Sequence, residues 1–241
     1  MDINRLLPLE KKKEIILGYL HPWKVAYKEA VEIQNQLRSQ LSFEPLKLPA
    51  RWVGGVDVSY CVKSRRLFGG VVVMDMQRGE IIEAISQVGK ETFPYIPGLL
   101  SFRELPIILE GLRKLRHWPE VFLVDGQGIA HPRGFGIASH LGVLLDLPTV
   151  GCAKSKLVGD YTRLVKKRGR YQYLYFNRKK VGAVVCTRDK VNPVYVSPGH
   201  RSDILSSIKL VLDCCKNFRI PEPLRCAHIL SNKIRNQEIS S

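Results

Sequence analysis

Three consecutive segments with the pattern of β-strands constrain the fold more than any other feature of this sequence. They cover residues 52–61, 67–76 and 80–88, and each is rich in Val or Ile. The connections between them, at 63–66 and 77–79, are short and polar. Because connections this short join antiparallel neighbours, the sequence predicts an antiparallel meander of three strands.

After the meander, the pattern changes to an alternation of helices and strands. A loop at 93–100 that contains two prolines and a glycine precedes a helix predicted to end near residue 115. The elements predicted next are a strand at 121–124, a helix at 135–145, a strand or turn from 149, and a hairpin with strands at 171–176 and 181–186. This order predicts an RNase H-like α/β fold, with a mixed sheet and helices on both faces.

Helices are also predicted at both ends of the chain. Residues 9–42 have the pattern of a charged amphipathic helix, and about 202–235 form a predicted C-terminal helical tail. The sequence carries no internal repeat and no low-complexity linker. We therefore expect a single domain over residues 1–241.

The charge balance indicates the class of partner. Lys and Arg number 38 against 22 Asp and Glu, a formal net charge of +16, and basic residues cluster at 166–170 and 178–180. A field of this sign attracts polyanions, which favours nucleic acid as the partner. A solubilising excess of lysine is the simpler alternative.

Cysteine spacing and hydropathy indicate the cellular setting that we expect for the protein. None of the six cysteines lies in a C-x-x-C pair, so a structural zinc site is not expected. Charges interrupt the first 20 residues, and no segment approaches the roughly 20 apolar residues of a membrane span. We expect a reducing, cytoplasmic setting without a membrane.

Two aspartates lie where a strand can present a carboxylate to a ligand. Asp57 is in the middle of the first strand, where burial is costly unless the carboxylate is paired or bound to a cation. An edge strand that faces solvent would accommodate it equally. Asp125 follows the apolar strand at 121–124, and ligands of open α/β sheets bind at the carboxyl ends of strands. The alternative role for Asp125 is to cap the turn through its own backbone.

Glu104 also fits a structural role, because residues 101–104 match a helix capping box. Pro106 argues against that cap, since proline is unfavourable one turn inside a helix. The predicted fold brings Asp57, Glu104 and Asp125 to one edge of the sheet. Two carboxylates 4 Å apart repel by about 4 kcal/mol at an effective dielectric constant of about 20. Such a cluster needs a divalent cation, and oxygen ligands favour Mg²⁺ or Mn²⁺.

Six segments, in order, resemble the endonuclease V family. They are 55–60, 94–98, 101–104, 125–136, 151–155 and 197–201. The resemblance implies an RNase H-like fold and a dependence on Mg²⁺, with Mn²⁺ as a substitute. It also implies hydrolysis of the second phosphodiester bond on the 3′ side of inosine, which leaves 3′-hydroxyl and 5′-phosphate ends.

The resemblance assigns roles to individual positions. Asp57, Glu104 and Asp125 are similar to the metal carboxylates of the family, His200 to the histidine that completes the metal centre, and Lys154 to the basic residue near the scissile phosphate. Residues Pro94, Tyr95, Ile96 and Pro97 resemble the wedge that fills the gap left by a displaced base. The positions similar to the base pocket are Gly98, Leu100, Gly126, His131, Gly136 and Ile137. Taken singly, these histidines, Lys154 and Tyr95 also fit ordinary surface or packing roles.

The segments 94–97 and 131–134 resemble the form of bacterial, DNA-directed members, so we expect the repair of deoxyinosine in DNA. We also expect a monomer. An inosine-RNA ribonuclease, an RNase H-like nuclease that cuts hybrid or branched strands, and a non-catalytic inosine-binding protein are the alternatives. Gln127 departs from the family pattern, since many relatives carry His or Asn there. Asp203 is a further candidate metal ligand, and it fits the first turn of the last predicted helix equally.

Overall fold

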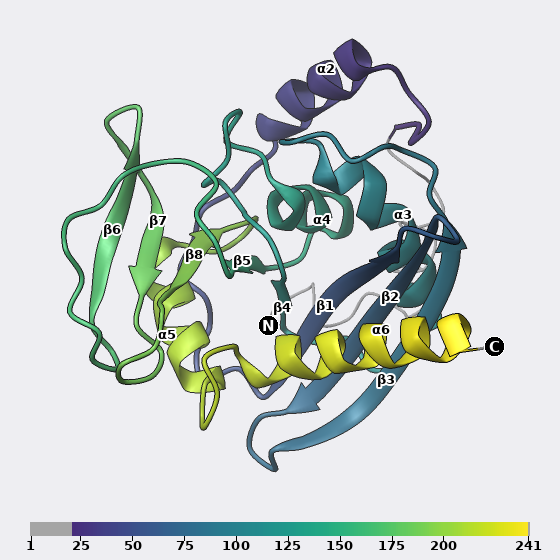
Figure 1. Cartoon of the computed structure of the whole chain (residues 1–241). Coiled ribbons are helices and arrows are strands. Elements are labelled where there is room, and N and C mark those ends of the chain that lie inside the picture. The colour runs from purple at the N-terminus through teal and green to yellow at the C-terminus, as the bar shows by residue number, and fades with distance from the viewer. Residues whose placement is uncertain (1–20, 241) are drawn as a thin grey trace, which may run out of the picture.

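A mixed sheet of eight strands organises the computed structural model, which describes residues 21–240 (Figure 1). The strands are β1 (Trp52–Cys61), β2 (Arg66–Asp75), β3 (Glu80–Lys90), β4 (Val121–Val124), β5 (Thr149–Ala153), β6 (Tyr171–Phe176), β7 (Lys179–Val185) and β8 (Val194–Pro198). The helices are α2 (Tyr27–Arg38), α3 (Leu100–Leu112), α4 (Ile137–Leu145), α5 (Ile204–Cys214) and α6 (Glu222–Ser240). The order of strands across the sheet is β3-β2-β1-β4-β5-β8-β7-β6.

The pairing confirms the predicted fold class. Strands β1, β2 and β3 form the antiparallel meander, β4 and β5 extend it in parallel, and β8, β7 and β6 continue it antiparallel. Helices α3 and α4 pack on one face, with Val56, Val71 and Phe122 in the core beneath them. Helices α5 and α6 cover the other face.

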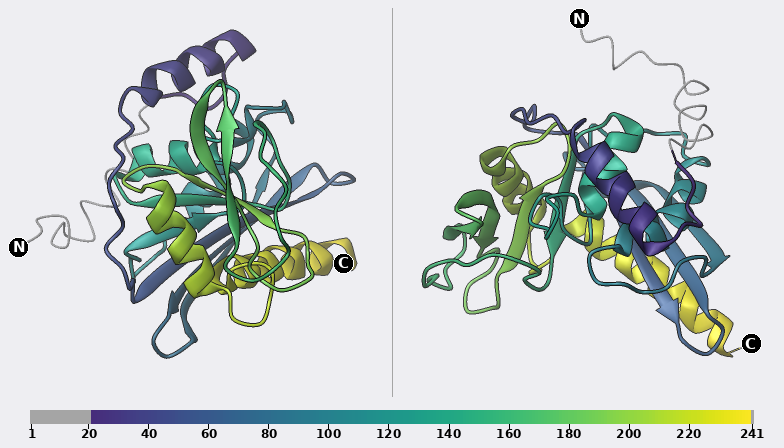
Figure 2. Two further views of the ribbon diagram at one scale, coloured as in Figure 1. Left: turned by 90° about the vertical axis from the view of Figure 1, so that its left-hand side faces the viewer. Right: turned by 90° about the horizontal axis from the view of Figure 1, so that it is seen from above.

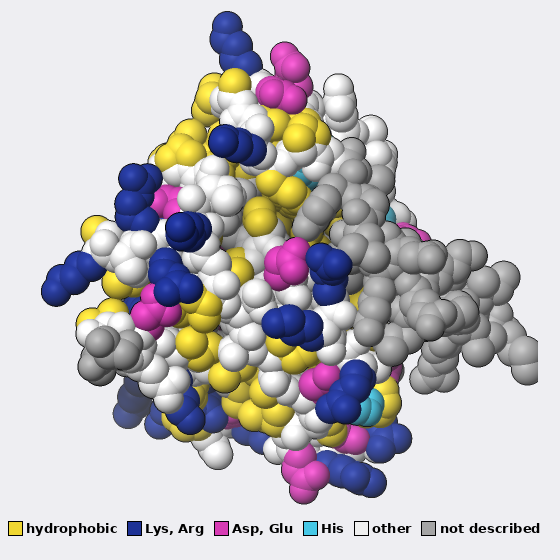
Figure 3. All heavy atoms as spheres, turned by 90° about the vertical axis from the view of Figure 1, so that its right-hand side faces the viewer, with side chains coloured by type: hydrophobic (Ala, Val, Ile, Leu, Met, Phe, Trp, Pro, Cys, Tyr) yellow, Lys and Arg dark blue, Asp and Glu magenta, His cyan; other side chains and the backbone are white. Residues whose placement is uncertain are grey.

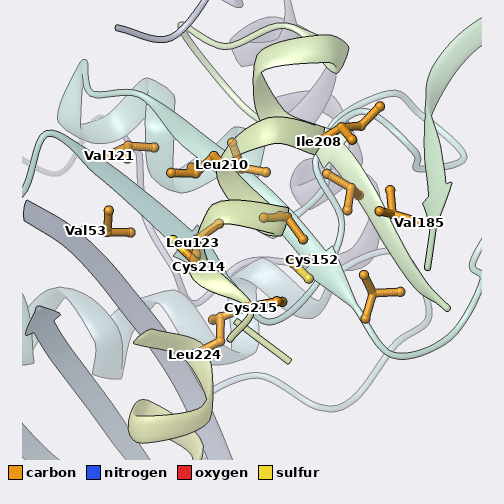
Figure 4. Packing of buried hydrophobic residues seen from close by; sticks show 14 of the residues in the cluster. Val53, Val121, Leu123, Cys152, Val185, Ile208, Leu210, Cys214, Cys215 and Leu224 are labelled. Atoms are coloured by element: carbon orange, nitrogen blue, oxygen red, sulfur yellow. The ribbon is translucent and has the colours of Figure 1, made fainter. Parts of the chain in front are cut away.

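The core under α5 joins strands from both halves of the sheet (Figure 4). Val53 and Leu123 come from the parallel part, Val185 comes from the hairpin, and Ile208 and Leu210 reach them from α5. Cysteines 152, 214 and 215 are buried free thiols in this core, which agrees with a packing role.

Helix α6 crosses β1 and β2 at very close range. A Cβ atom on Gly55 would lie 2.2 Å from the carbonyl oxygen of Pro223, so only glycine fits at this crossing. The helix ends at Ser240, beyond the predicted end of the tail near residue 235, and residues 215–221 separate it from α5. Because α6 lies against the middle of β1, its side chains reach Asp57.

The predicted N-terminal helix is too long. Helix α2 covers Tyr27–Arg38, the chain leaves helical geometry after Ser39, and residues 9–20 of the predicted helix lie outside the described residues. The hydroxyl of Ser39 donates to the carbonyl oxygen of Gln36, 2.7 Å away, and so satisfies a terminal carbonyl of the helix. Helix α2 packs outside α4 (Figure 2, right).

One strand was not predicted. Strand β8 has five residues, follows Asn192-Pro193 and ends at Pro198, so its local sequence has the signature of a loop. Tertiary packing makes it a strand, because Val194 and Val196 are buried in the core under α5. None of the helices over residues 21–240 is both long and apolar enough to cross a membrane.

Candidate metal centre and nucleic-acid site

Two of the predicted carboxylates meet because β1 and β4 are parallel neighbours. Val56 pairs with Val124, and the N–H of Asp125 donates to the carbonyl oxygen of Val56 at 3.2 Å. This register sets Asp125 beside Asp57, one residue beyond the end of β4. Asp57 is buried, and Asp125 is partly exposed.

A histidine from α6 completes this group. His228 Nδ1 lies 3.1 Å from Asp57 Oδ2, and the hydroxyl of Ser231, one turn further along α6, donates to the same oxygen at 2.7 Å. One ligand atom each from Asp57, Asp125 and His228 lie within 4.8 Å of one another. Two carboxylates and an imidazole at this spacing have the chemistry of a divalent cation site.

Glu104 lies next to this group on α3. Burial and the negative charges of Asp57 and Asp125 raise the pKa of Glu104 well above its ordinary value, against the opposing charge of Arg103. Burial and the charge of Asp57 also raise the pKa of Asp125. The three predicted carboxylates therefore do converge, and their charges repel one another.

Lys154 is a cation in direct contact with this group. It directly follows β5, the parallel neighbour of β4, and its Nζ lies 2.6 Å from Asp125 Oδ2. The Lys154 side chain is still substantially exposed, so its ammonium group can also reach a ligand from solvent. Lys154 and Asp125 are thus side by side, as the predicted roles require.

His200 is not brought to the carboxylates, which corrects the prediction that it completes the metal centre. Its backbone N–H bonds the hydroxyl of Thr149 at the start of β5, whereas Asp125 follows the end of the parallel strand β4. Its ring is already paired: Nδ1 accepts the Ser42 N–H at 3.3 Å, and Nε2 lies 3.2 Å from Asp146 Oδ1. His200 thus holds the chain segment at Ser42 to the far end of α4.

The sequence holds little signal for His228. It lies in a polar helical segment, with Ser231 and Asn232 one turn away, and such a stripe also suits a solvent-facing helix. Only the crossing of α6 over β1 places its ring beside Asp57. Asp203, the marginal candidate, is the N-cap of α5, and its side chain accepts the Ser206 N–H at 2.7 Å.

The loop before α3 presents Tyr95 to solvent. Phe93 is buried and anchors the start of the loop, and Ile96 packs partly against the same core cluster. Tyr95 is 63% exposed, and the guanidinium carbon of Arg103 lies 5.6 Å from the centre of its ring. Pro94 and Pro97 are both exposed beside it. This geometry suits the predicted wedge, because an exposed ring stands on a short loop with fixed ends.

The first turn of α3 differs from the predicted capping box. The N-cap is Leu99, no side chain caps the helix, and Pro106 lies inside it. Instead of capping, Ser101 lies 3.0 Å from Nδ1 of the buried His140 in α4. Glu104 is thereby free of a capping role and points toward the carboxylate group.

Gly98 is the centre of a buried polar cluster. Its carbonyl oxygen accepts from Gln34 Nε2 at 3.1 Å, from His131 Nε2 at 3.0 Å, and from the Arg133 guanidinium. Gln34 comes from α2 and also donates to the carbonyl oxygen of Phe135. Gly98 and His131, two predicted pocket residues, are therefore in direct contact, and Gln34 and Arg133 are neighbours that sequence reasoning missed.

Three of the other predicted pocket residues, Gly126, Gly136 and Ile137, follow Asp125 in the chain. Gly126 adjoins Ile137, because an added Cβ would lie 2.5 Å from Ile137 Cγ2, and Ile137 itself is buried. The N–H of Gly136 donates to the carbonyl oxygen of Gly128. Leu100 is the partly exposed first residue of α3. The structure brings Gly98 together with His131, and Gly126 together with Ile137.

Gln127, the residue that departs from the family pattern, is used inside the protein. Its Nε2 donates to the carbonyl oxygen of Ser155 at 3.1 Å, and Ser197 in β8 donates to its Oε1 at 3.4 Å. The side chain is buried and braces the loop against the segment that follows Lys154. A role in holding the loop accounts for a glutamine at this position.

Comparison with known proteins agrees with this site. A family model described as Endonuclease V matches residues 34–229, which is most of the chain. The chain is 45% identical over 215 residues to "Endonuclease V" of Dictyoglomus thermophilum, covering 89% of this chain and 93% of that protein. The chain belongs to the endonuclease V family.

Solved structures of the family share its fold. The endonuclease V of Streptomyces avermitilis superposes with a TM-score of 0.85 at 36% identity, covering 90% of this chain and 96% of that chain. The endonuclease V of Ciona intestinalis, solved with a 24mer DNA containing an inosine followed by a ribo-adenosine, superposes with a TM-score of 0.76. The identity there is 27%, and the match covers 88% of this chain and 98% of that chain. As an endonuclease V, this chain is a hydrolase that cleaves phosphodiester bonds.

Proposed function

We propose that this endonuclease V recognises inosine in nucleic acid and hydrolyses the second phosphodiester bond on its 3′ side, leaving 3′-hydroxyl and 5′-phosphate ends. The observation that carries the proposal is the meeting of Asp57, Asp125 and His228, with Glu104 and Lys154 beside them. The inosine-containing DNA bound by the Ciona intestinalis relative supports the choice of substrate.

A divalent cation fits the residues of this site. Asp57, Asp125 and His228 would hold it, with Glu104 as a further carboxylate, because these ligands carry an excess of negative charge. The carboxylate oxygens favour Mg²⁺, with Mn²⁺ as a substitute. When bound, such an ion would activate water and stabilise charge on the attacking and leaving oxygens.

The protein side chains around the site have separate tasks. Ser231 donates to Asp57 and so fixes the orientation of that carboxylate, and the buried position of Asp57 excludes bulk water. The Lys154 ammonium group would leave Asp125 for the scissile phosphate and offset its charge. Substrate binding would thus exchange the ion pair between Lys154 and Asp125 for one between Lys154 and the phosphate.

Recognition would use the loop between Asp125 and α4, together with Tyr95. Inosine carries a carbonyl group at position 6 where adenosine carries an amino group, so a backbone N–H donor accepts one base and rejects the other. A displaced base leaves a gap in the stack, and the exposed ring of Tyr95 would fill it. The buried bonds around Gly98 would keep the two parts of the pocket in register.

DNA is the proposed substrate, in the repair of deaminated adenine, and inosine-containing RNA is the alternative. Matched DNA and RNA strands that carry one inosine, with adenosine strands as controls, would be incubated with Mg²⁺ and the cut mapped at single-nucleotide resolution. We expect a single cut at the second bond 3′ to inosine, faster on DNA. Faster cutting of RNA would reverse the choice of substrate.

The same assay tests the centre itself. Asp125→Asn should abolish the cut while binding to the inosine strand persists or strengthens, because less negative charge faces the phosphates. Binding of inosine without any metal-dependent cut by the unmodified protein would favour a non-catalytic inosine-binding protein. Equal cutting of an undamaged hybrid would favour a general RNase H-like nuclease.

A further inference from the structure

Three tyrosines line one side of β6, at the edge of the sheet far from the meander. Tyr171, Tyr173 and Tyr175 are alternate residues, so their rings lie on the same face of the strand. The ring centres are 5.6 Å apart for the first pair and 6.5 Å apart for the second, in edge-to-face geometry. We refer to these three residues as the tyrosine stripe.

The stripe is open to solvent at both ends. Tyr171 is 37% exposed and Tyr175 is 44% exposed, while Tyr173 between them is half-buried beneath Lys180, whose Nζ lies 4.2 Å from the ring centre. The opposite face of the strand does the packing, since Leu174 is buried against Val184 and Ala130. The exposed rings are therefore not required to fill the core.

The β6–β7 hairpin stands at the outside of the molecule (Figure 2, left). Strand β7 is its partner on one side, and on the other side the described chain adds a two-bond bridge between Asp160 and Tyr175. The hairpin thus presents an aromatic surface that only a short stretch of chain borders.

Basic residues are concentrated around the stripe. Residues 160–190 contain ten Lys and Arg against two Asp, a formal charge of +8 and half of the +16 of the whole chain. By contrast, acidic side chains lie among the basic ones on the face in Figure 3, which views the molecule from the opposite side. Charge and aromatic surface therefore coincide on one hairpin and its neighbours.

The stripe is on the same side of the sheet as the candidate metal centre. Ala183, the partner of Tyr173 in β7, belongs to the core that α5 covers, and Asp57 bonds α6 on that side. The strand register also places Tyr171 at the same end of the sheet as Lys154. Three strand spacings of about 4.8 Å separate β5 from β6, roughly 15 Å in all.

We propose that the tyrosine stripe is an accessory binding site for unpaired nucleic acid, with bases stacked on Tyr171 and Tyr175 and phosphates near Lys180. Every base has a face that stacks on an aromatic ring, so such a site tolerates any sequence. A duplex offers no free base faces, so the site selects a single strand. The inference rests on the proposed function only in taking nucleic acid as the substrate.

Binding of an inosine-free single strand tests the inference. A fluorescent oligo-dT and an oligo-U of equal length would be titrated with the full chain in EDTA, which prevents metal-dependent cleavage, and followed by fluorescence anisotropy. Tyr171→Ala and Tyr175→Ala should each weaken binding of both strands by about tenfold, and the double variant by about a hundredfold. The corresponding Phe variants should bind within about threefold of the wild type, because stacking needs the ring and not the hydroxyl group.

Tyr27→Ala is the matched control, since Tyr27 is 53% exposed on α2. It should bind the single strand like the wild type, and a duplex of equal length should bind all the variants alike. Thermal unfolding identifies any Ala variant that fails to fold, and a Leu variant at the same position, which keeps apolar bulk without an aromatic face, should then show the same loss of binding. Unchanged single-strand binding by the folded Tyr→Ala variants, or an equal loss in Tyr27→Ala, would overturn the proposal.

The two proposals fail separately. If the chain does not cut beside inosine but still loses single-strand affinity in the stripe variants, only the proposed function is wrong. If it cuts beside inosine and the stripe variants bind the inosine-free strand normally, only the accessory site is wrong.

Discussion

His131 shows how one buried side chain depends on its protonation state. Burial and the nearby charge of Arg133 lower the pKa of His131 to about 4, against the raising effect of its bond to the Gly98 carbonyl oxygen. Its Nε2 donates to that oxygen, so its Nδ1 is the acceptor that receives the Arg133 N–H at 3.2 Å. If Nδ1 also carried a proton, two donors, this N–H and the backbone N–H of Arg133, would face each other and their hydrogen bond would be lost.

This geometry predicts a loss of stability in acid. Since the pKa of His131 is lower in the folded chain than its usual 6.5, the unfolded chain takes up the proton first. The contribution of His131 to the free energy of unfolding is therefore complete above pH 6.5, and it falls by about 3 kcal/mol as the pH drops to 4. Urea unfolding of the wild type and of His131→Gln should therefore show a gap in the free energy of unfolding that narrows toward pH 4. A gap independent of pH would contradict this.

Substitution of the two candidate histidines should have different effects, one on cleavage and the other on stability. His228→Ala should reduce metal-dependent cleavage by at least about 100-fold and weaken Mn²⁺ binding, because the ring lies beside Asp57. His200→Ala should keep most of the cleavage and lose about 1–3 kcal/mol of stability, since it leaves the Ser42 N–H without its acceptor. Cleavage rates and calorimetric Mn²⁺ titration of the folded variants check both. A loss of cleavage and Mn²⁺ binding in His200→Ala, but not in His228→Ala, would instead make His200 the metal ligand.

The carboxylates were predictable from the sequence, and the histidine was not. Asp57 and Asp125 stand at the middle and the end of recognisable strands, so strand pairing alone brings them together. His228 depends on where α6 crosses the sheet, and that path follows from side-chain packing that no local pattern records. The resemblance nominated His200 as the metal histidine, whereas the fold places His228 beside Asp57.

At the scale of elements, the loop from Phe93 to Leu99 carries the clearest test of recognition. Tyr95→Ala should lose about 1–3 kcal/mol of binding to an inosine strand, and Tyr95→Phe should lose little, since a wedge needs the ring. The measurement is the affinity for inosine and adenosine strands, with metal dependence checked in parallel. Full discrimination by Tyr95→Ala would leave the ring a surface aromatic beside Arg103.

Elements with strong local patterns were predicted closely, and those set by tertiary contacts were not. Strands β1, β4 and β6 have the predicted bounds, because their apolar runs end at clear turn signals. Strand β8 is short and ends in proline, so only its burial between β5 and β7 defines it. Helix α2 ends at Arg38 because a cap at Ser39 overrides a helical composition that continues beyond it.

For the whole molecule, the net charge of +16 predicts binding that weakens steeply with salt. Each phosphate contact on duplex DNA lowers the logarithm of the binding constant by about 0.9 per tenfold rise in salt. Replacing Lys166, Lys167 and Arg170 by Gln should flatten that slope by up to about 2.7, if all three meet phosphates. Duplex binding from 50 to 300 mM salt measures it. An unchanged slope would mean that this basic cluster is only solvated.

The path of α6 has a consequence for the life of the enzyme. The ligands proposed for the metal come from β1, α3, the end of β4 and α6, so the last helix of the described chain supplies one of them. During translation, a chain whose synthesis has not yet reached α6 folds around an incomplete centre. With the ligand set proposed here, the metal centre is complete, and the enzyme able to cleave, only after that helix has emerged from the ribosome and docked on β1.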